Sequence, residues 1–183
     1  MSLTRDPSAA PVLSGAGVVL RPWEAGDEAY ARALAADPEV HRWSVVPVEA
    51  EDAGRLVSAR RAAGPHDPPA WVIVDAAAGD PVGDVSFRWV LPELRIAAIG
   101  YVVLGAARGR GVATAAVRLA SGYVLGTLGW PRLELHHAVA NPASCRVAAK
   151  TGFALEGTLR RAMRYAGGNW EDEHLHARLR ADP

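Results

Sequence analysis

The chain has 183 residues, half of them hydrophobic, with 20 acidic and 20 basic side chains, so its formal net charge is zero. This length and apolar content are typical of one compact domain, and the lack of net charge excludes a general attraction to nucleic acid or to an anionic membrane. No apolar run is long enough to span a bilayer, and the single cysteine excludes both an intrachain disulfide and a cysteine-rich zinc site.

The first third of the chain predicts a tail, a strand and two helices. Residues 1–17 are polar, lack an apolar signal core and are expected to form a flexible tail before a single domain over residues 18–183. The expected elements are a strand at 18–21 and helices at 27–36 and 49–63. Asp27 can cap the first helix, and Asp37-Pro38 ends it. Gly64-Pro65 ends the second.

The remaining elements predict an α/β (α+β) fold. The pattern predicts strands at 70–75, 82–90, 95–104, 132–140, 153–161 and 171–180, with helices at about 112–125 and 142–151. The first three strands read as an antiparallel meander. Asn141 and Pro142 are typical of a helix start, Gly152 of a helix end, and residues 167–169 of a turn. We expect a mixed, mostly antiparallel sheet of about seven strands with about four helices.

The loop at 105–111 is rich in glycine and leads from a strand into a helix. Glycine lets backbone N–H groups turn inward, and the helix start adds unpaired N–H donors and a partial positive charge. The loop therefore predicts a site for a phosphate or pyrophosphate, with Arg108 and Arg110 adding charge at its rim. A tight glycine turn without a ligand is the alternative.

Two other phosphate-binding motifs are excluded for this loop. A Walker A loop ends in Gly-Lys-Ser/Thr, which is absent here. The Rossmann fingerprint has another glycine pattern and lies in a parallel βαβ unit, whereas the strand before this loop is expected to be antiparallel.

Residues 108–113, Arg-Gly-Arg-Gly-Val-Ala, are similar to the signature Gln/Arg-x-x-Gly-x-Gly/Ala of the GNAT superfamily of N-acetyltransferases. Further blocks resemble its ribosomal-protein N-terminal acetyltransferase (RimJ/RimL-type) branch. These blocks are Leu-Arg-Pro at 20–22, Asp-Pro-Glu-Val at 37–40, Asn-Pro-Ala-Ser at 141–144, Lys-Thr-Gly-Phe at 150–153 and Glu-Gly-Thr-Leu-Arg at 156–160. The resemblance spans residues 18–179 and implies a GNAT-like fold.

The resemblance also implies acetyl-coenzyme A as the cofactor. In this family the strand before the loop and the strand after the next helix splay apart, and the pantetheine arm lies in the gap. Backbone groups of Tyr101, Val102 and Val103 would bind the arm, and one N–H would polarise the thioester carbonyl. The residues implied to bind the pyrophosphate are Arg108, Gly109, Arg110, Gly111, Val112, Ala113 and Thr114. Asn141 is implied to contact the cofactor as well as to cap its helix.

Acetyl transfer to an amine needs an acid for the leaving thiolate. Ser144 matches the family serine that is thought to protonate the sulfur, although a serine at a helix start can also simply bond to backbone. Tyr101 and Cys145 are further candidates. The alternatives are a tyrosine packed beside the cofactor strand and a small buried apolar thiol.

The general base is not identified from the sequence, because the positions where relatives carry a carboxylate are Ala98 and Met163 here. The remaining candidates are His136, His137, Glu93, Asp172, Glu173 and His174. His136 and His137 are adjacent in a strand, so at most one of them faces the cleft. A water chain, or an amine that arrives neutral, would make a base unnecessary.

Two smaller features complete the candidates. His174 and His176 share one strand face, as a metal pair would, but no third ligand stands at a telling spacing, so no metal is expected. Trp43 and Trp89 are candidates for lining an acceptor pocket.

The sequence thus predicts a single-domain N-acetyltransferase that transfers acetyl from acetyl-coenzyme A to a primary amine, by resemblance a protein N-terminal amine. One alternative is a small amine acceptor, such as an antibiotic, a polyamine or an amino-acid derivative. Another is a coenzyme A-binding module without catalysis, which the missing carboxylates leave open. The low cysteine content fits a cytoplasmic location. No nucleic acid or membrane partner is expected, and a homodimer is left open.

Overall fold

The fold is built on one mixed sheet of eight strands, in a computed structural model that describes residues 10–44, 50–62, 68–91, 93–166 and 168–182. The strands are β1 (Leu13–Gly15), β2 (Val18–Pro22), β3 (Trp71–Asp75), β4 (Pro81–Leu91), β5 (Ile96–Val103), β6 (Arg132–Ala138), β7 (Ala154–Arg164) and β8 (Trp170–Leu179). The helices are α1 (Glu28–Ala36), α2 (Pro38–Arg42), α3 (Ala53–Arg61), α4 (Val112–Gly122) and α5 (Pro142–Lys150).

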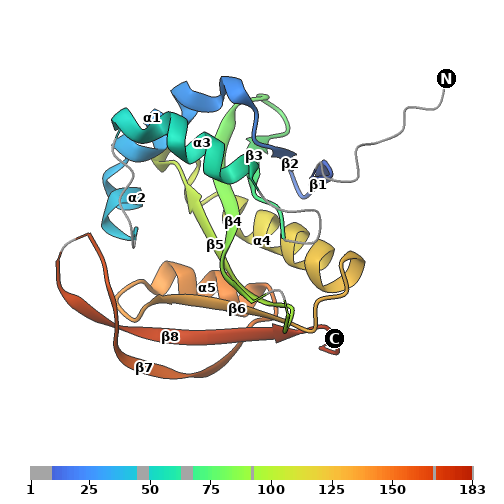
Figure 1. Ribbon diagram of the computed structural model, residues 1–183, viewed down its shortest axis with the longest axis vertical. Coiled ribbons are helices and arrows are strands. Elements are labelled where there is room, and N and C mark those ends of the chain that lie inside the picture. The colour runs from blue at the N-terminus through green and yellow to red at the C-terminus, as the bar shows by residue number, and fades with distance from the viewer. Residues whose placement is uncertain (1–9, 45–49, 63–67, 92, 167, 183) are drawn as a thin grey trace.

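The strands follow the order β1-β2-β3-β4-β5-β6-β8-β7, and the β5–β6 pair alone is parallel. A parallel pair needs a crossover, and α4 makes it. In Figure 1, β6, β7 and β8 run across the lower part of the molecule, while β4 and β5 run down towards them. The sheet therefore has two halves, joined at β5 and β6.

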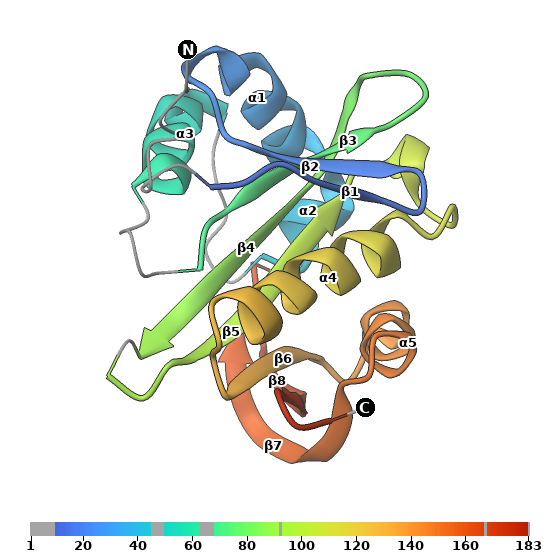
Figure 2. The ribbon, with the colours of Figure 1, turned by 90° about the vertical axis from the view of Figure 1, so that its right-hand side faces the viewer.

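Helices cover both faces of the first half of the sheet because its strands alternate between two cores. Val72 packs with α1 and α3, whereas its neighbours Trp71 and Ile73 pack against α4. Figure 2 shows α1 and α3 on one side of β3 and β4, and α4 on the other. Ile99 of β5 and Leu133 of β6 belong to the same core as α4, so this core continues across the join.

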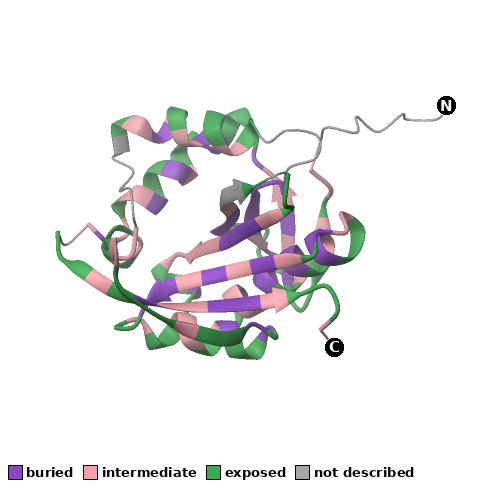
Figure 3. Cartoon of the chain, turned by 60° about the horizontal axis from the view of Figure 1, so that its bottom comes forward, coloured by how far each residue is buried: buried purple, intermediate pink, exposed green. Residues whose placement is uncertain are grey.

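Burial falls towards the outside of the second half of the sheet. Along the central strands, buried and half-buried residues alternate, while the outer faces of the helices are exposed (Figure 3). β7 forms the edge of the sheet and is exposed along most of its length. The interior of this half therefore lies between β6, β8 and α5.

The expected mixed sheet with covering helices is confirmed, and three details differ from the expectation. Leu13–Gly15, expected in the tail, pairs with β2 as β1. Asp37-Pro38 ends α1 as expected, but it also starts the short α2, whose first N–H groups bond to the Asp37 carboxylate. The Asp27 carboxylate accepts no capping bond from α1, because it accepts instead from Arg21 and from the Glu24 N–H. Residues 1–9 and 49, the helix end at 63–65 and the turn residue at 167 lie outside the described residues.

Candidate functional site

β5 and β6 separate after a short stretch of pairing. Ile96–Ala98 pair with Arg132–Glu134, and beyond this point β5 stays paired with β4 up to Val103 while β6 stays paired with β8 up to Ala138. Among the described strands, none pairs with the facing edges beyond the join, so these edges offer backbone groups that a ligand can bind. This opening, called the split below, is the one expected between the strand before α4 and the strand after it.

The register of β5 decides which backbone groups face the split. The Leu104 N–H donates to the Val82 carbonyl at 2.9 Å. Because backbone groups alternate between the two edges of an antiparallel strand, those of Val102 point to β4, and those of Tyr101 and Val103 point to the split. Of the three residues expected to bind a pantetheine arm through their backbone, Val102 is therefore directed away from it.

The loop between β5 and α4 presents a row of backbone N–H groups. Gly109 and Gly111 have φ values of +77° and +82°, a left-handed conformation that favours glycine, and no atom lies within 4 Å of the position a Cβ would take. The Ala115 N–H bonds to the Gly111 carbonyl at 3.0 Å, which starts the hydrogen-bond ladder of α4. The N–H groups of residues 112–114 come before this bond and therefore have no partner within the helix. This geometry suits an anion at the start of α4.

Arg108 holds this loop in place instead of standing free at its rim. Its Nε donates to the Val103 carbonyl at 2.9 Å, and its Nη2 lies 2.6 Å from Asp37 Oδ1. Asp37 also accepts from the Gly105 N–H at 3.0 Å. Burial opposes ionisation of Asp37, but Arg108 and backbone N–H groups outweigh it and lower the pKa of this carboxyl. The start of α2 and the loop are thus joined by one carboxylate.

Arg110 is paired in a similar way with the turn after β3. Its Nη2 lies 2.5 Å from Asp75 Oδ2, and Asp75 also accepts from the N–H groups of Ala77 and Ala78. These two backbone bonds, followed by Arg110, lower the pKa of Asp75. Both arginines expected to bind the pyrophosphate are therefore neutralised by aspartates. The attraction for an anion at the loop comes from backbone N–H groups.

Two hydroxyl groups approach each other across the split, one from β5 and one from α5. Asn141 caps α5 by accepting from the Ser144 N–H at 3.2 Å, as expected, and this cap fixes the serine in the first helical turn. The Tyr101 hydroxyl is buried and has no hydrogen-bond partner among the described residues. Burial raises the pKa of Tyr101 to about 12, and the nearby Ser144 hydroxyl, which falls short of hydrogen-bond geometry, opposes this rise.

A buried network of charged side chains surrounds His136 of β6, on the face of the sheet opposite to His137. Glu173, which is 1% exposed, accepts from the Tyr165 hydroxyl at 2.5 Å and lies 3.7 Å from His136 Nδ1. His136 Nε2 lies 3.0 Å from Glu134. Burial would raise the pKa of Glu173, but His136 and Tyr165 outweigh it and lower the pKa. Burial likewise disfavours the charged His136, but Glu173 and Glu134 raise its pKa.

A hollow of about 210 Å³ opens beside the start of α5. Its lining consists of Arg42, Trp43, Ala140, Tyr165, Asn169 and Glu171. The rings of Trp43 and Tyr165 meet edge to face, with centroids 6.0 Å apart. Trp43 thus lines a pocket as expected, whereas the Trp89 side chain lies outside the described part of the chain. One acidic and one basic side chain make the lining neutral.

Glu171 is not among the candidates predicted from the sequence, although it lies beside a position where a carboxylate was expected. In the β7–β8 ladder it pairs directly with Met163, the position at which the family resemblance implies a carboxylate. Directly paired residues project on the same face of a sheet. Glu171 therefore presents a carboxylate next to the missing one, from the neighbouring strand, and it lines the hollow. No pattern within one strand indicates this exchange, because it depends on the register of two strands.

The other candidates for the base lie in different places. Glu93 is exposed in the turn between β4 and β5, and Asp172 accepts from the Arg161 N–H at 2.7 Å. His136 and Glu173 belong to the buried network behind the hollow. His137 and His174 lie on the opposite face of the sheet, as the alternation along β6 requires.

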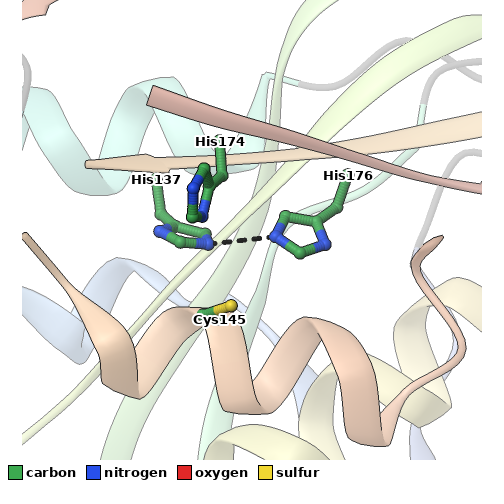
Figure 4. A group of neighbouring side chains, drawn as sticks. All are labelled: His137, Cys145, His174 and His176. Atoms are coloured by element: carbon green, nitrogen blue, oxygen red, sulfur yellow. Dashed lines mark hydrogen bonds between the residues drawn. The ribbon is translucent and has the colours of Figure 1, made fainter. Parts of the chain in front are cut away.

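The histidine pair at 174 and 176 has the additional neighbours that the sequence did not indicate. His137 of β6 and Cys145 of α5 lie beside His174 and His176 of β8, with one ligand atom from each residue within 4.8 Å of the others (Figure 4). The expectation that no metal binds at this strand face stays a prediction, but two further potential ligand groups lie beside the histidine pair. His137 and Cys145 lie 37 and 29 residues before His174 in the chain. The pairing of β6 with β8 places His137 opposite His174, and the packing of α5 adds Cys145.

The model of the family described as acetyltransferase (GNAT) domain matches residues 18–154, about three quarters of the chain. The chain is 37% identical over 102 residues to the probable N-acetyltransferase YjcK of Bacillus subtilis. The aligned region covers 55% of this chain and 56% of that protein. It is 30% identical over 98 residues to the ribosomal-protein-serine acetyltransferase of Escherichia coli, with 54% of each chain covered. The aligned part spans about half the length of these curated relatives.

A solved structure of Mycobacterium smegmatis RimJ in complex with CoA-disulfide is similar to the whole fold. Its TM-score is 0.79 at 29% sequence identity, and the match covers 93% of this chain and 86% of that one. Among the described residues, no helix is both long and apolar enough to cross a membrane.

Proposed function

The chain belongs to the GNAT acetyltransferase family, and from this we propose that it transfers the acetyl group of acetyl-coenzyme A to a primary amine. The observation that carries the proposal is the buried Tyr101 hydroxyl, which lies near Ser144 and has no hydrogen-bond partner within the part of the chain that the structure describes. An unpaired buried hydroxyl costs free energy, so such a group is typical of a site that a ligand completes.

The residues present fit coenzyme A at both ends of the split. The N–H groups around Gly109, Gly111 and residues 112–114 can hold the pyrophosphate, and the space where a Cβ would stand at the two glycines is open. The backbone of Tyr101 and the Val103 N–H can bind the pantetheine arm as a strand would, while the Val103 carbonyl already accepts from Arg108. When bound, coenzyme A supplies the thioester that is broken. An N–H on this edge can polarise the thioester carbonyl as negative charge develops.

Ser144 and Tyr101 can manage the proton that the leaving sulfur needs. Ser144 is fixed by the Asn141 cap, and the Tyr101 hydroxyl lies close to it. We assign the donation of the proton to Ser144, with Tyr101 orienting or resupplying that hydroxyl. The raised pKa of Tyr101 keeps its hydroxyl protonated at neutral pH, which suits a donor.

Glu171 can take the proton that the acceptor amine loses. It lines the hollow next to the start of α5 and projects from the ladder position opposite Met163. Tyr165 closes the same hollow and is held by Glu173. The amine would therefore enter from the hollow, between the carboxylate of Glu171 and the first turn of α5.

A protein N-terminal amine is the acceptor that the hollow favours. Arg42 and Glu171 make its lining neutral, so it offers no excess of negative charge for a polyamine. Two similar proteins are named for ribosomal-protein acetylation or as RimJ. The reaction would take place in the cytoplasm, where a chain with one free cysteine stays reduced.

An acceptor screen tests this function. Wild-type protein is incubated with acetyl-coenzyme A and either peptides with free N-termini or small amines, while thiol release and the added acetyl mass are followed. We expect turnover with N-terminal peptides above that with polyamines. Binding of coenzyme A without acetyl transfer to any acceptor would contradict catalysis and favour the binding module.

A further inference from the structure

A second cluster of polar side chains lies between the β6–β8 ladder and α5. Figure 4 shows the imidazoles of His137, His174 and His176 extending from the strands towards the thiol of Cys145 on the helix. His137 and His176 are 4% and 2% exposed, whereas Cys145 and His174 are half-buried. None of the four side chains takes part in the acetyl transfer proposed above.

The hydrogen bonds of His137 and His176 leave two bare ring nitrogens facing each other. Nδ1 of His137 lies 2.8 Å from the Ala138 carbonyl oxygen, and Nδ1 of His176 lies 3.3 Å from that of Phe153. A carbonyl oxygen only accepts, so each Nδ1 carries the ring hydrogen. A neutral ring then has a lone pair on Nε2, and the two Nε2 atoms are 3.2 Å apart. Two lone pairs at this distance repel unless a cation lies between them.

The distances suit a small tetrahedral ion. Zn–N bonds of about 2.0–2.1 Å at tetrahedral angles place two nitrogen ligands about 3.3 Å apart, close to the 3.2 Å between the Nε2 atoms of His137 and His176. All four ligand atoms lie within 4.8 Å of one another. Cys145 and His174 would therefore move inward by roughly 1 Å, which side-chain rotation provides. The Nδ1 of His174 is buried and has no hydrogen-bond partner among the described residues, so it is free to act as a ligand.

We propose that His137, His174, His176 and Cys145 bind one zinc ion per chain. Three imidazoles and a thiolate in a tetrahedral arrangement are typical of zinc, and four protein ligands leave no position for a substrate, so the site is structural. Binding breaks the S–H bond of Cys145, releases the proton to solvent and forms an S–Zn bond, without electron transfer. The carbonyls of Ala138 and Phe153 orient two of the rings as outer-shell partners.

The ion would join α5 to the strands directly beside the proposed site of acetyl transfer. Cys145 follows Ser144 in the first turn of α5, while the three histidines belong to β6 and β8. A bond from Cys145 to the sheet would hold this turn against the strands. The zinc site is thus a positioning device for α5, and its presence is measured without any activity assay.

Cobalt(II) titration of untagged, metal-free protein tests the proposal. A tetrahedral site with one thiolate gives intense visible bands and a sulfur-to-cobalt charge-transfer band, with an end point of one ion per chain that an equal amount of Zn²⁺ bleaches. Cys145 is the only cysteine, so the charge-transfer band of the wild type identifies this site without any variant. We expect protein purified without chelator to contain one zinc per chain by elemental analysis.

Variants separate this site from adventitious binding. Cys145→Ser should abolish the charge-transfer band, and His174→Ala should weaken Co²⁺ binding by about 100-fold or more. His41→Ala, a change at an exposed histidine of α2, should leave spectrum and affinity unchanged. Zn²⁺ should raise the Tm of the wild type and of His41→Ala only. Failure of the wild type to bind Co²⁺, or binding without a thiolate band, would overturn the proposal and indicate a proton shared by His137 and His176.

Discussion

Asp37 and Arg108 form an ion pair at 2.6 Å, although 71 residues separate them in the chain. The same carboxylate accepts from the Gly105 N–H and caps α2. One aspartate therefore holds both the glycine loop and the short helix that leads to the acceptor hollow. The block Asp-Pro-Glu-Val at residues 37–40, which contributed to the family resemblance, thus has a physical role at the cofactor end of the site.

Asp37→Asn should destabilise the fold by about 1 kcal/mol, at the low end for a charged hydrogen bond because Arg108 is partly exposed. The pKa of Asp37 is lowered in the folded state, so its carboxylate stabilises the fold fully above its ordinary value of 3.8. This contribution is lost as the pH falls through the lower folded pKa. Urea unfolding should be measured for the wild type and for Asp37→Asn across a range of pH. The difference between their free energies of unfolding should be constant near neutral pH and should shrink in acid.

Asp52→Asn provides the matched control for this measurement. Asp52 also precedes a helix, but it makes no capping hydrogen bond and its ion pair with Arg55 is exposed. Its effect should stay within about 0.5 kcal/mol at any pH. If Asp37→Asn and Asp52→Asn behave alike, the link between the loop and α2 contributes nothing to stability.

Gly111→Asp should weaken coenzyme A binding by at least about tenfold, because it places a carboxylate at the start of α4. Gly111→Asn is the matched control, since asparagine has the same shape and both residues tolerate the left-handed φ of +82° better than other side chains. The space for the new side chain is open. Calorimetry should find much higher affinity for the asparagine variant. Equal coenzyme A affinities of the aspartate and asparagine variants would show that the pyrophosphate does not bind at this loop.

Tyr101→Phe and Ser144→Ala should separate binding from chemistry. Ser144→Ala should lower kcat by about 100-fold while changing coenzyme A affinity little. Tyr101→Phe removes a buried hydroxyl that no described residue bonds to, so we expect equal or higher stability together with lower turnover. Thermal unfolding and steady-state kinetics on the same preparations measure both effects. Full turnover in both variants would exclude these hydroxyls as the source of the proton.

Glu171→Gln should lower kcat by about 100-fold or more if this carboxylate takes the proton of the amine. The loss should be smaller with acceptors of lower amine pKa, which arrive neutral. Glu93→Gln, at an exposed turn between β4 and β5, serves as the control and should retain wild-type rates. Unchanged rates of the Glu171→Gln enzyme with all acceptors would exclude Glu171 as the general base. His136 and Glu173 would then be the next candidates.

Much of the fold follows from the sequence because it rests on local signals. The cap at Asn141, the proline after it and the left-handed Gly152 locate α5 correctly. The glycines at 109 and 111 locate the start of α4. In contrast, β1 and α2 were missed, because three and five residues carry too little periodicity to stand out from a tail or a turn.

The parts of the site that escaped prediction depend on contacts between distant segments. Arg110 pairs with Asp75, which lies 35 residues earlier in the chain. The arginine was expected to bind a ligand, and this ion pair neutralises its charge within the protein instead. Glu171 comes to lie opposite Met163 through the register of two strands. Cys145 joins the three histidines only after α5 packs on the sheet. Composition and spacing within one segment do not contain this information.

The most direct test of the account is a crystal structure of the protein grown with coenzyme A. We expect the pyrophosphate on the N–H groups between Gly109 and Thr114, the arm along the β5 edge at Tyr101 and Val103, and the sulfur beside Ser144. A complex with coenzyme A bound elsewhere, and the split between β5 and β6 closed or empty, would contradict the proposed site of acetyl transfer.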